Sequence, residues 1–371
     1  MKIGVDTIGL KHGRSGVAFY LSSFLHNLHD LREDVTIELF GTEVDRYTYG
    51  NESNYIYNSF VTYDGFPENF WHRRMMPSFV KKNNYDLVFF KVGQKCYPFT
   101  GKVKGVAVVH EIISESLKHI DSAMERKLLL KSLQNSHAII SSSQYVKNDM
   151  VQLGIDPEKI HVIYTGVDHQ HFFPKTDFTD EFVTISPFSI KRPFFIYPSS
   201  ITDYEKNHIN LVNGFSFFKE KTSLPHRLVL AGSEGQISHA VHELVTSCPA
   251  NSDIFLTGYF PHQNLPDLLS SAEACVYPSS IEGSGGPVLE ALASGIPVIC
   301  SKSGVLPEIT GGNAMFFDSN NANEICECLE KIASDKEFKD KLVKDGIAWA
   351  EKFSWQKNIE ETYRLIKQIL R

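Results

Sequence analysis

The sequence has few of the features that mark secreted, metal-binding or membrane-spanning proteins. Its 371 residues include six cysteines, and no two of them form a CxxC pair. A zinc site of paired cysteines and a disulfide framework are therefore not expected, and a reducing compartment is the default. No apolar run approaches the roughly 20 residues of a membrane-spanning helix, and the opening residues MKIGVD do not resemble a signal peptide. We therefore expect a cytoplasmic protein.

An excess of positive charge is missing as well. The chain holds 37 Lys and Arg against 44 Asp and Glu, which gives a formal net charge of -7. Because nucleic-acid binding depends on a positive field, we expect no nucleic-acid partner. A GxGxxG motif is also absent after the first predicted strand. This absence counts against a nicotinamide-dependent dehydrogenase, although that class stays open as an alternative on a fold of this kind.

The composition and the pattern of apolar residues predict two α/β domains. Hydrophobic residues make up 42% and charged residues 22%, as in ordinary globular proteins, and 371 residues exceed one usual core. Short apolar runs typical of buried parallel strands alternate with helical stripes. The predicted strands are residues 2–6, 35–40, 86–90, 105–109, 138–141, 194–198, 227–231, 253–256, 274–277 and 297–300. This alternation predicts two doubly wound, Rossmann-like halves with the active site in the cleft between them.

The boundary between the two halves should lie in an unpatterned stretch between residues 165 and 193. Gly166, Pro174 and Pro187 interrupt it. We therefore assign residues 1–175 to the first domain and 176–353 to the second. The last segment, 354–371, carries an apolar stripe at helical spacing that must be buried somewhere, formed by Ile359, Tyr363, Ile366 and Leu370.

The most informative segment reads VYPSSIEGSGGPVLEALASGIPVICSKSGVLPE, residues 276–308. A predicted strand ends near Tyr277, a glycine-rich loop follows, and a helix is expected to start near Pro287. Loop amides at a helix start favour an anion such as a diphosphate. Glu282 and Glu290, with seven residues between them, flank this loop, and carboxylates there suit sugar and ribose hydroxyls. An ordinary strand, loop and helix with two surface glutamates is the alternative.

This segment resembles the signature of glycosyltransferase family 4, retaining enzymes of the GT-B fold. The resemblance implies that Glu282 contacts the donor sugar and that Glu290 holds the ribose hydroxyls. The loop amides from Ser284 to Pro287 would meet the diphosphate. The donor-binding loop is thus formed by Gly283, Ser284, Gly285, Gly286 and Pro287.

The resemblance extends over most of the chain and implies further site residues. His110, after the predicted strand 105–109, would stand beside the reacting sugar, and Gly16 belongs to a first loop that closes over the diphosphate. Lys206 matches a lysine that faces the diphosphate. Ser200 stands where the family has an arginine, so the phosphate clamp departs from the family pattern. Gly258 and Tyr259 resemble a base-binding turn, and the terminal helix would pack back on the first domain. The implied catalytic residues are His110, Lys206 and Glu282.

The resemblance implies a retaining, metal-independent hexosyl transfer. The donor would be a nucleotide-diphosphate sugar, such as one of mannose, glucose or rhamnose. The acceptor would be a glycan or a lipid-linked hydroxyl in surface polysaccharide or glycoconjugate synthesis. No cofactor is expected, and the chain contains no Asp-x-Asp pair to hold a cation. A phosphorylase or a sugar-nucleotide epimerase on the same fold is the alternative.

One segment bears on the membrane. Residues 70–76, FWHRRMM, and Lys81 with Lys82 mix basic and large apolar side chains. Such a stretch favours either peripheral contact with the inner face of the membrane or a solvated helix with a packed apolar face, and we prefer the second interpretation. The oligomeric state does not follow from the sequence.

Overall fold

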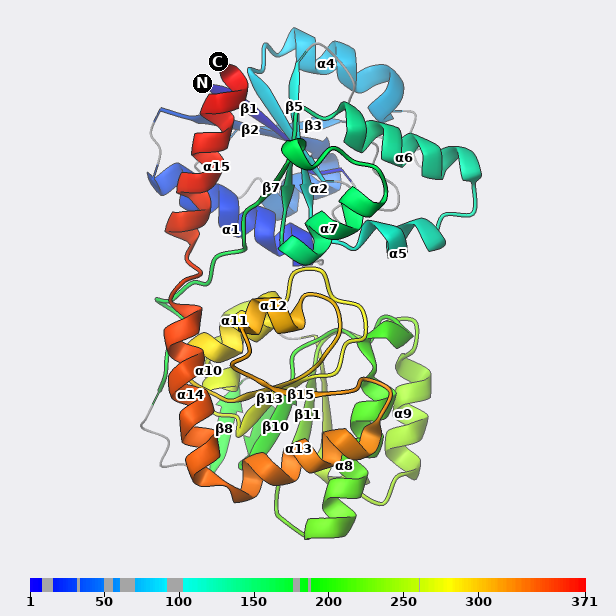
Figure 1. Ribbon diagram of the computed structural model, residues 1–371, viewed down its shortest axis with the longest axis vertical. Helices are drawn as coiled ribbons and strands as arrows, with labels where there is room; N and C mark the ends of the chain where they lie inside the picture. Colours follow the sequence, from blue (N-terminus) through cyan, green and yellow to red (C-terminus); the bar gives the residue numbers. More distant parts are fainter. Residues whose placement is uncertain are drawn as a thin grey trace. The chain divides into compact units, whose positions relative to one another are not determined.

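The chain forms two compact α/β units. The computed structural model describes residues 1–8, 16–31, 34–49, 56–60, 71–91, 103–175, 181–185, 188–259 and 261–371. One unit comprises Met1–Gly166 together with Trp355–Arg371, and the other comprises Val167–Ser354 (Figure 1). Residues 167–175, which the sequence analysis gave to the first domain, lie in the second unit. Each unit is described by itself below.

The first unit is built on a parallel sheet whose described strands follow the order β3-β2-β1-β4-β5-β6-β7. Chain order reverses between β1 and β4, which pair in parallel. The strands are β1 (Lys2–Asp6), β2 (Thr36–Thr42), β3 (Ile56–Phe60), β4 (Leu87–Lys91), β5 (Lys104–Val109), β6 (Ala138–Ser141) and β7 (Ile160–Val162). The central residues of β1, β2, β4, β5 and β6 are buried on both faces, as expected for a sheet covered by helices on each side.

The helices of the first unit connect these strands. They are α1 (Gly16–Leu31), α2 (Glu43–Tyr49), η2 (Trp71–Met75), α4 (Met76–Lys82), α5 (Ile113–Lys118), α6 (Ala123–Asn135), α7 (Gln144–Gln152) and η3 (Pro157–Lys159). Local sequence sets several of their starts: the side chain of Ser122 accepts from the Glu125 amide, and Ser143 accepts from the Val146 amide. Such caps satisfy amides that have no partner inside the helix.

The C-terminal helix α15 (Trp355–Leu370) belongs to the first unit and lies beside α1 (Figure 1). Its stripe enters the same core cluster as Leu25 and Leu28 of α1, with Ile359 and Ile366 both fully buried. Asn358 donates to the carbonyl of Tyr164 at 2.7 Å. Both apolar packing and a hydrogen bond thus hold α15 against the rest of the first unit.

The second unit repeats the plan with a parallel sheet in the order β12-β11-β10-β13-β14-β15 among its described strands. Chain order reverses here between β10 and β13. The strands are β10 (Phe194–Tyr197), β11 (Arg227–Ala231), β12 (Ile254–Gly258), β13 (Ala274–Tyr277), β14 (Val298–Ser301) and β15 (Met315–Phe317), and a small antiparallel pair precedes them, β8 (Phe182–Ile185) with β9 (Phe188–Lys191).

Helices cover this second sheet, with α8 and α13 side by side (Figure 1). The helices are η4 (Tyr204–Lys206), α8 (His208–Thr222), α9 (Ser238–Ser247), η5 (Asn251–Asp253), η6 (His262–Asn264), α10 (Leu265–Ser270), α11 (Gly286–Ala293), α12 (Leu306–Thr310), α13 (Ala322–Ser334) and α14 (Lys336–Ala350). Gly214 of α8 faces Ile325 of α13 so closely that an added Cβ would meet the Ile325 side chain at 2.7 Å. A glycine is therefore required for this helix packing.

Candidate active site

The sheet topology brings two candidate residues of the second unit, Lys206 and Glu282, to one place. Lys206 follows β10, and Glu282 follows β13, the two neighbouring strands at which chain order reverses. The carboxyl ends of two such strands leave a crevice, because their connections depart to opposite faces of the sheet. This is where ligands bind in doubly wound sheets.

The turn that carries Lys206 is stabilised by hydrogen bonds within it and to the loop after β13. The side chain of Asp203 accepts from the Lys206 amide at 3.1 Å, and Asn207 adopts the left-handed conformation with φ of 59°. The carbonyl of Glu205 accepts hydrogen bonds from the amide of Ser280 at 2.8 Å and from the hydroxyls of Ser279 and Ser280. The turn after β10 is thus hydrogen-bonded to the loop after β13. These bonds hold the main chain next to Lys206 in place.

The loop that carries Glu282 is held from the other side by the turn after β14. The amide of Val305 donates to the Glu282 carbonyl at 3.0 Å. Gly304 has φ of 60°, and an added Cβ there would lie 2.4 Å from the same carbonyl oxygen. Only glycine permits this approach. Gly285 also has a positive φ, 66°, and precedes the first residue of α11.

Lys206 and Glu282 form a partly buried ion pair. The Nζ of Lys206 lies 3.1 Å from Oε2 of Glu282, the hydroxyl of Tyr277 donates to the same oxygen at 3.1 Å, and the Gly285 amide donates to Oε1 at 3.4 Å. Burial by itself would raise the pKa of Glu282, but the Lys206 ammonium and these hydrogen bonds outweigh it and lower the pKa. Burial likewise opposes the charge of Lys206, and Glu282 outweighs it and raises the pKa of the lysine. Both groups therefore carry their charges at neutral pH.

The glycine-rich loop offers fewer free amides than the sequence analysis assigned to it. Pro287 has no N–H, so it cannot contribute an amide to an anion and serves instead as the second residue of α11. The amide of Gly285 is directed at Glu282. Ser284 and Gly286 remain as candidate amide donors, while Gly283 is buried beside Glu282 in the chain.

Glu290 lies inside α11 and is buried, with 8% of its surface exposed. Its Oε1 is 3.6 Å from Nε2 of His262, and its Oε2 has no hydrogen-bond partner within the described residues. The His262 ring contacts the ring of Phe172, with centroids 6.0 Å apart. A buried carboxylate oxygen without a partner is costly, and a ligand hydroxyl would satisfy it.

Of the remaining donor-site candidates of the second unit, Ser200 follows β10, and Gly258 and Tyr259 lie at the end of β12. Ser200 shares a hydrogen bond of 2.9 Å with Ser233, so at this position a hydroxyl pair stands where the family pattern has an arginine. Gly258 ends β12 with φ of 64°, and the side chain of Tyr259 is 73% exposed. These contacts do not join Ser200, Gly258 or Tyr259 to the Lys206–Glu282 pair.

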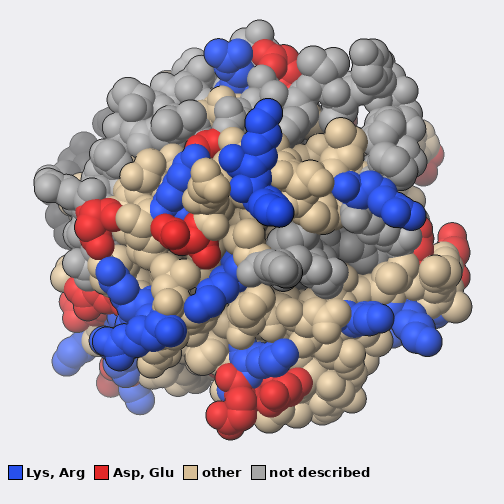
Figure 2. All heavy atoms as spheres, turned by 90° about the horizontal axis from the view of Figure 1, so that it is seen from above, with Lys and Arg blue, Asp and Glu red and all other residues tan. Residues whose placement is uncertain are grey.

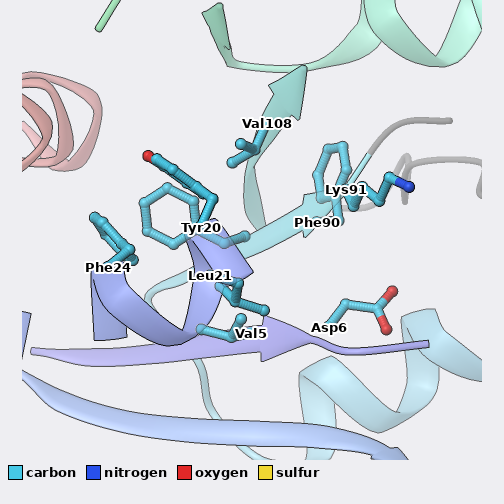
Figure 3. Close-up of a pocket in the computed structure, with 9 residues that line it drawn as sticks. Val5, Asp6, Tyr20, Leu21, Phe24, Phe90, Lys91 and Val108 are labelled. Carbon is cyan, nitrogen blue, oxygen red and sulfur yellow. The ribbon is translucent and has the colours of Figure 1, made fainter. Parts of the chain in front are cut away.

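The carboxyl ends of β1, β4 and β5 form a separate pocket in the first unit (Figure 3). It measures about 390 Å³, counting the space open to solvent. Its walls are mostly apolar and come from these strands and from α1: Val5, Asp6, Tyr20, Leu21, Phe24, Phe89, Phe90, Lys91 and Val108. Lys91 pairs with Glu111 at 3.1 Å.

His110 follows β5, packs on the ring of Tyr20 at a centroid distance of 4.2 Å, and is 8% exposed. Burial and, to a smaller extent, the nearby Lys91 ammonium together lower its pKa to about 3. The ring is therefore neutral at physiological pH. Its Nε2 has no hydrogen-bond partner in the described parts of the chain. Gly16 is the first residue of α1, and the loop before it lies outside the described residues.

Two family models together match most of this chain. The model "Glycosyltransferase Family 4" matches residues 14–171, and "Glycosyl transferases group 1" matches residues 179–349. The chain belongs to glycosyltransferase family 4. The two models divide the chain much as the two units do, and the paired glutamates fall within the second match.

The curated relatives of this glycosyltransferase are distant. The O-antigen chain mannosyltransferase B of Escherichia coli is 25% identical over 241 residues, which are 65% of this chain and 63% of the relative. The alpha-maltose-1-phosphate synthase of Mycolicibacterium smegmatis is 24% identical over 64% of this chain and 65% of its own length. The chain thus matches less than two thirds of the length of either relative.

Solved structures share the fold over the whole glycosyltransferase chain. Sucrose-phosphate synthase from Thermosynechococcus elongatus aligns with a TM-score of 0.77 at 17% identity, covering 100% of this chain and 99% of the other. Anabaena HepE in complex with UDP and glucose aligns with a TM-score of 0.77 at 15% identity and 99% coverage of both. The expected GT-B fold, two parallel-sheet α/β domains, is confirmed.

The described residues contain no group of three or more His, Cys, Asp or Glu side chains arranged to hold a metal ion. None of the helices in the same residues combines the length and the apolar character needed to cross a lipid bilayer.

Sequence reasoning did not find three residues that the structure places at the candidate site. Tyr277 was noted only as a strand end, although its hydroxyl contacts Glu282. Tyr197, whose hydroxyl donates to the Lys206 carbonyl at 2.8 Å, was counted only within a predicted strand. His262 was not singled out at all. A tyrosine at the last position of each central strand was the available signal for the first two.

Proposed function

We propose that this family 4 protein transfers a hexose from a nucleotide-diphosphate donor to a hydroxyl of a glycan or lipid-linked acceptor, with retention at the anomeric carbon. The observation that carries the proposal is the Lys206–Glu282 pair at the crevice of the second sheet, beside the start of α11. It puts a cation and an oriented carboxylate where a charged sugar donor would bind.

Transfer of the sugar requires a cation near the diphosphate and a group that orients the sugar. When the bond between the anomeric carbon and the phosphate oxygen breaks, positive charge grows on the sugar and negative charge on the diphosphate. Lys206 would stabilise the departing diphosphate, and Glu282 would orient the sugar through its hydroxyls. Because the two side chains contact each other, a bound donor must share or replace this contact.

His110 suits a different task. A neutral imidazole accepts or donates a hydrogen bond without adding charge, and the low pKa keeps this ring neutral throughout the physiological range. In this proposal its unpartnered Nε2 orients a sugar hydroxyl rather than acting as a general base. The acceptor hydroxyl would lose its proton to the leaving phosphate.

The names of the relatives suggest which donors to try first. Mannosyltransferases of O-antigen synthesis are among them, and a structural neighbour was solved with UDP and glucose. We therefore propose a role in surface polysaccharide assembly, with mannose as the first sugar to test. A thermal-shift screen of UDP-, GDP- and dTDP-sugars finds the base, since a ligand of the folded state raises its stability.

Transfer itself is tested with the donor that the screen identifies. Incubation with candidate glycans should give a product whose anomeric configuration, read by NMR, equals that of the donor. An inverted product would contradict retention. Conversion of the donor to an epimer without any acceptor would contradict transfer and favour the epimerase alternative.

We also propose that turnover needs no metal ion. The Lys206 ammonium takes the place that a divalent cation would have beside a diphosphate. Turnover in excess EDTA should equal turnover with magnesium. Loss of activity in EDTA that magnesium or manganese restores would refute this part of the proposal.

Peripheral contact with a membrane would use the exposed basic residues of η2 and α4. Arg74, Lys81 and Lys82 are exposed there, while Trp71, Met76 and Val80 are buried. On the face shown in Figure 2, basic side chains lie among acidic ones. Co-sedimentation with anionic vesicles, compared between the wild type and Lys81→Glu/Lys82→Glu, tests this contact.

A further inference from the structure

Two buried tyrosines stand at the ends of the central strands of the second sheet. Tyr197 ends β10 and Tyr277 ends β13, and they are 0% and 3% exposed. Their rings meet edge to face, with centroids 5.3 Å apart and planes at 88°. Each therefore has a packed ring and a hydroxyl whose position is set by the sheet.

The two hydroxyls have different partners. The Tyr197 hydroxyl donates to a main-chain atom, the carbonyl of Lys206. The Tyr277 hydroxyl donates to a charged side chain, at the same oxygen of Glu282 that Lys206 contacts. Burial raises the pKa of the Tyr277 phenol well above its usual value, and the adjacent Glu282 raises it further. Tyr277 thus stays protonated and acts toward Glu282 as a donor.

These contacts constrain the whole carboxylate. Oε2 of Glu282 receives Tyr277 and Lys206, and Oε1 receives the Gly285 amide. A carboxylate has about four lone-pair sites shared by its two oxygens, so Oε1 keeps capacity for a ligand hydroxyl, and Oε2 gains it when Lys206 turns to a ligand. When a donor diphosphate attracts the flexible Lys206 side chain, Tyr277 remains as the fixed side-chain contact of Glu282.

We propose that Tyr277 is a positioning and specificity residue: its hydroxyl holds the Glu282 carboxylate in the orientation that accepts one arrangement of hydroxyls on the donor sugar. The inference rests on the proposed function of Glu282. A rigid acceptor discriminates between sugar epimers because the wrong epimer leaves a buried oxygen without its hydrogen bond. A carboxylate that is free to rotate could accept a hydrogen bond from the hydroxyl of either epimer, so it would discriminate less between them.

The test compares Tyr277→Phe with a matched control in the same chain. Tyr85 of the first unit donates to Glu38 at 2.7 Å, and Glu38 pairs with Lys2 at 2.7 Å, so these residues form a second set of buried tyrosine, buried glutamate and partly exposed lysine. Tyr85→Phe removes the same atom from the same kind of contact. Circular dichroism and thermal unfolding of both variants check that the fold is kept.

The primary measurement is calorimetric affinity for the sugar nucleotide and for its nucleoside diphosphate without the sugar. For Tyr277→Phe we expect roughly tenfold weaker binding of the sugar nucleotide, as for loss of a hydrogen bond to a charged group, and unchanged binding of the diphosphate. The ratio of kcat/KM between epimeric donors should fall. The lower pH limit of sugar-nucleotide binding should move upward, because Glu282 loses one donor that favours its charged form.

A double variant tests whether Tyr277 acts through Glu282 or stabilises the site in some other way. In Glu282→Ala the added Tyr277→Phe change should have no further effect on the affinity ratio, because alanine leaves no side-chain oxygen for the Tyr277 hydroxyl to hold. Equal weakening of both ligands, an additive double variant, or a Tyr277→Phe variant that matches Tyr85→Phe would overturn the proposal. If wild-type protein bound nucleoside diphosphates but discriminated no sugar, the proposed function would fail first, whatever the variants did.

Discussion

The ammonium of Lys206 lies 3.1 Å from a carboxylate oxygen of Glu282, so the groups expected to meet the donor diphosphate and the donor sugar contact each other. The side chains are 26% and 10% exposed. In a partly dehydrated setting, removal of one partner leaves the other charge uncompensated. Each group therefore influences both the chemistry and the protonation of its neighbour.

Lys206→Ala should lower turnover by about a hundredfold or more, because one preorganised stabiliser of the leaving group is removed. The variant should also bind donors only above a higher pH than the wild type, since the pKa of Glu282 rises without the lysine. Lys339→Ala is the control: Lys339 is 27% exposed and pairs with Glu273 at 2.6 Å. Steady-state kinetics within a few-fold of wild type for Lys206→Ala would show that the diphosphate is neutralised elsewhere.

Glu290→Ala should weaken nucleotide binding about tenfold while the fold stays intact, because the lost carboxylate hydrogen-bonds a ribose hydroxyl in our proposal. Calorimetry with a ribonucleoside diphosphate and its 2′,3′-dideoxy analogue checks this. The analogue should bind wild type and variant alike. His262→Ala should give a smaller effect in the same direction, because His262 lies 3.6 Å from Glu290. Equal losses for both nucleotides would place Glu290 away from the ribose.

His110 should make the protein less stable in acid. Its pKa is lowered from 6.5 to about 3 in the fold, so the unfolded chain binds an extra proton between these values. The contribution of the neutral His110 ring to the free energy of unfolding is therefore fully present above pH 6.5 and is lost as the pH falls toward 3. From pH 7 to 5 the wild type should lose roughly 2 kcal/mol that His110→Gln retains. Urea unfolding of both proteins at the two pH values measures this, and parallel losses would contradict the buried neutral ring.

Ile366→Ala should destabilise the protein by about 2–5 kcal/mol, the usual cost of a large-to-small change in a core. Ile366 is fully buried in the cluster shared by α1 and α15. The exposed Gln368 on the same helix serves as control, and Gln368→Ala should change stability by no more than about 0.5 kcal/mol. Denaturant midpoints compare the two. Similar small effects would mean that α15 contributes little to the core of the first unit.

The sequence determined the class of fold and the positions of its main strands. The ten predicted strands, among them 2–6, 138–141 and 274–277, all correspond to observed strands within one or two residues, because buried parallel strands are continuous apolar runs. It did not reveal β3, β7, β8, β9 or β15, whose apolar runs are short or interrupted. The spacing of Glu282, the glycines and Glu290 also follows from the sequence, since a loop and one helical turn set it locally.

The tertiary structure alone decided which distant groups meet. Lys206 and Glu282 are 76 positions apart, and only the pairing of β10 with β13 puts their loops together. The stripe on α15 shows that the helix must bury a face, but that face fits any apolar surface, and the structure shows that it fits α1. The sequence likewise could not show that Tyr277 holds Glu282 or that burial keeps His110 neutral. The spacing of apolar residues can be read directly from the sequence. Side-chain contacts and pKa values depend instead on which distant residues the folded chain brings together.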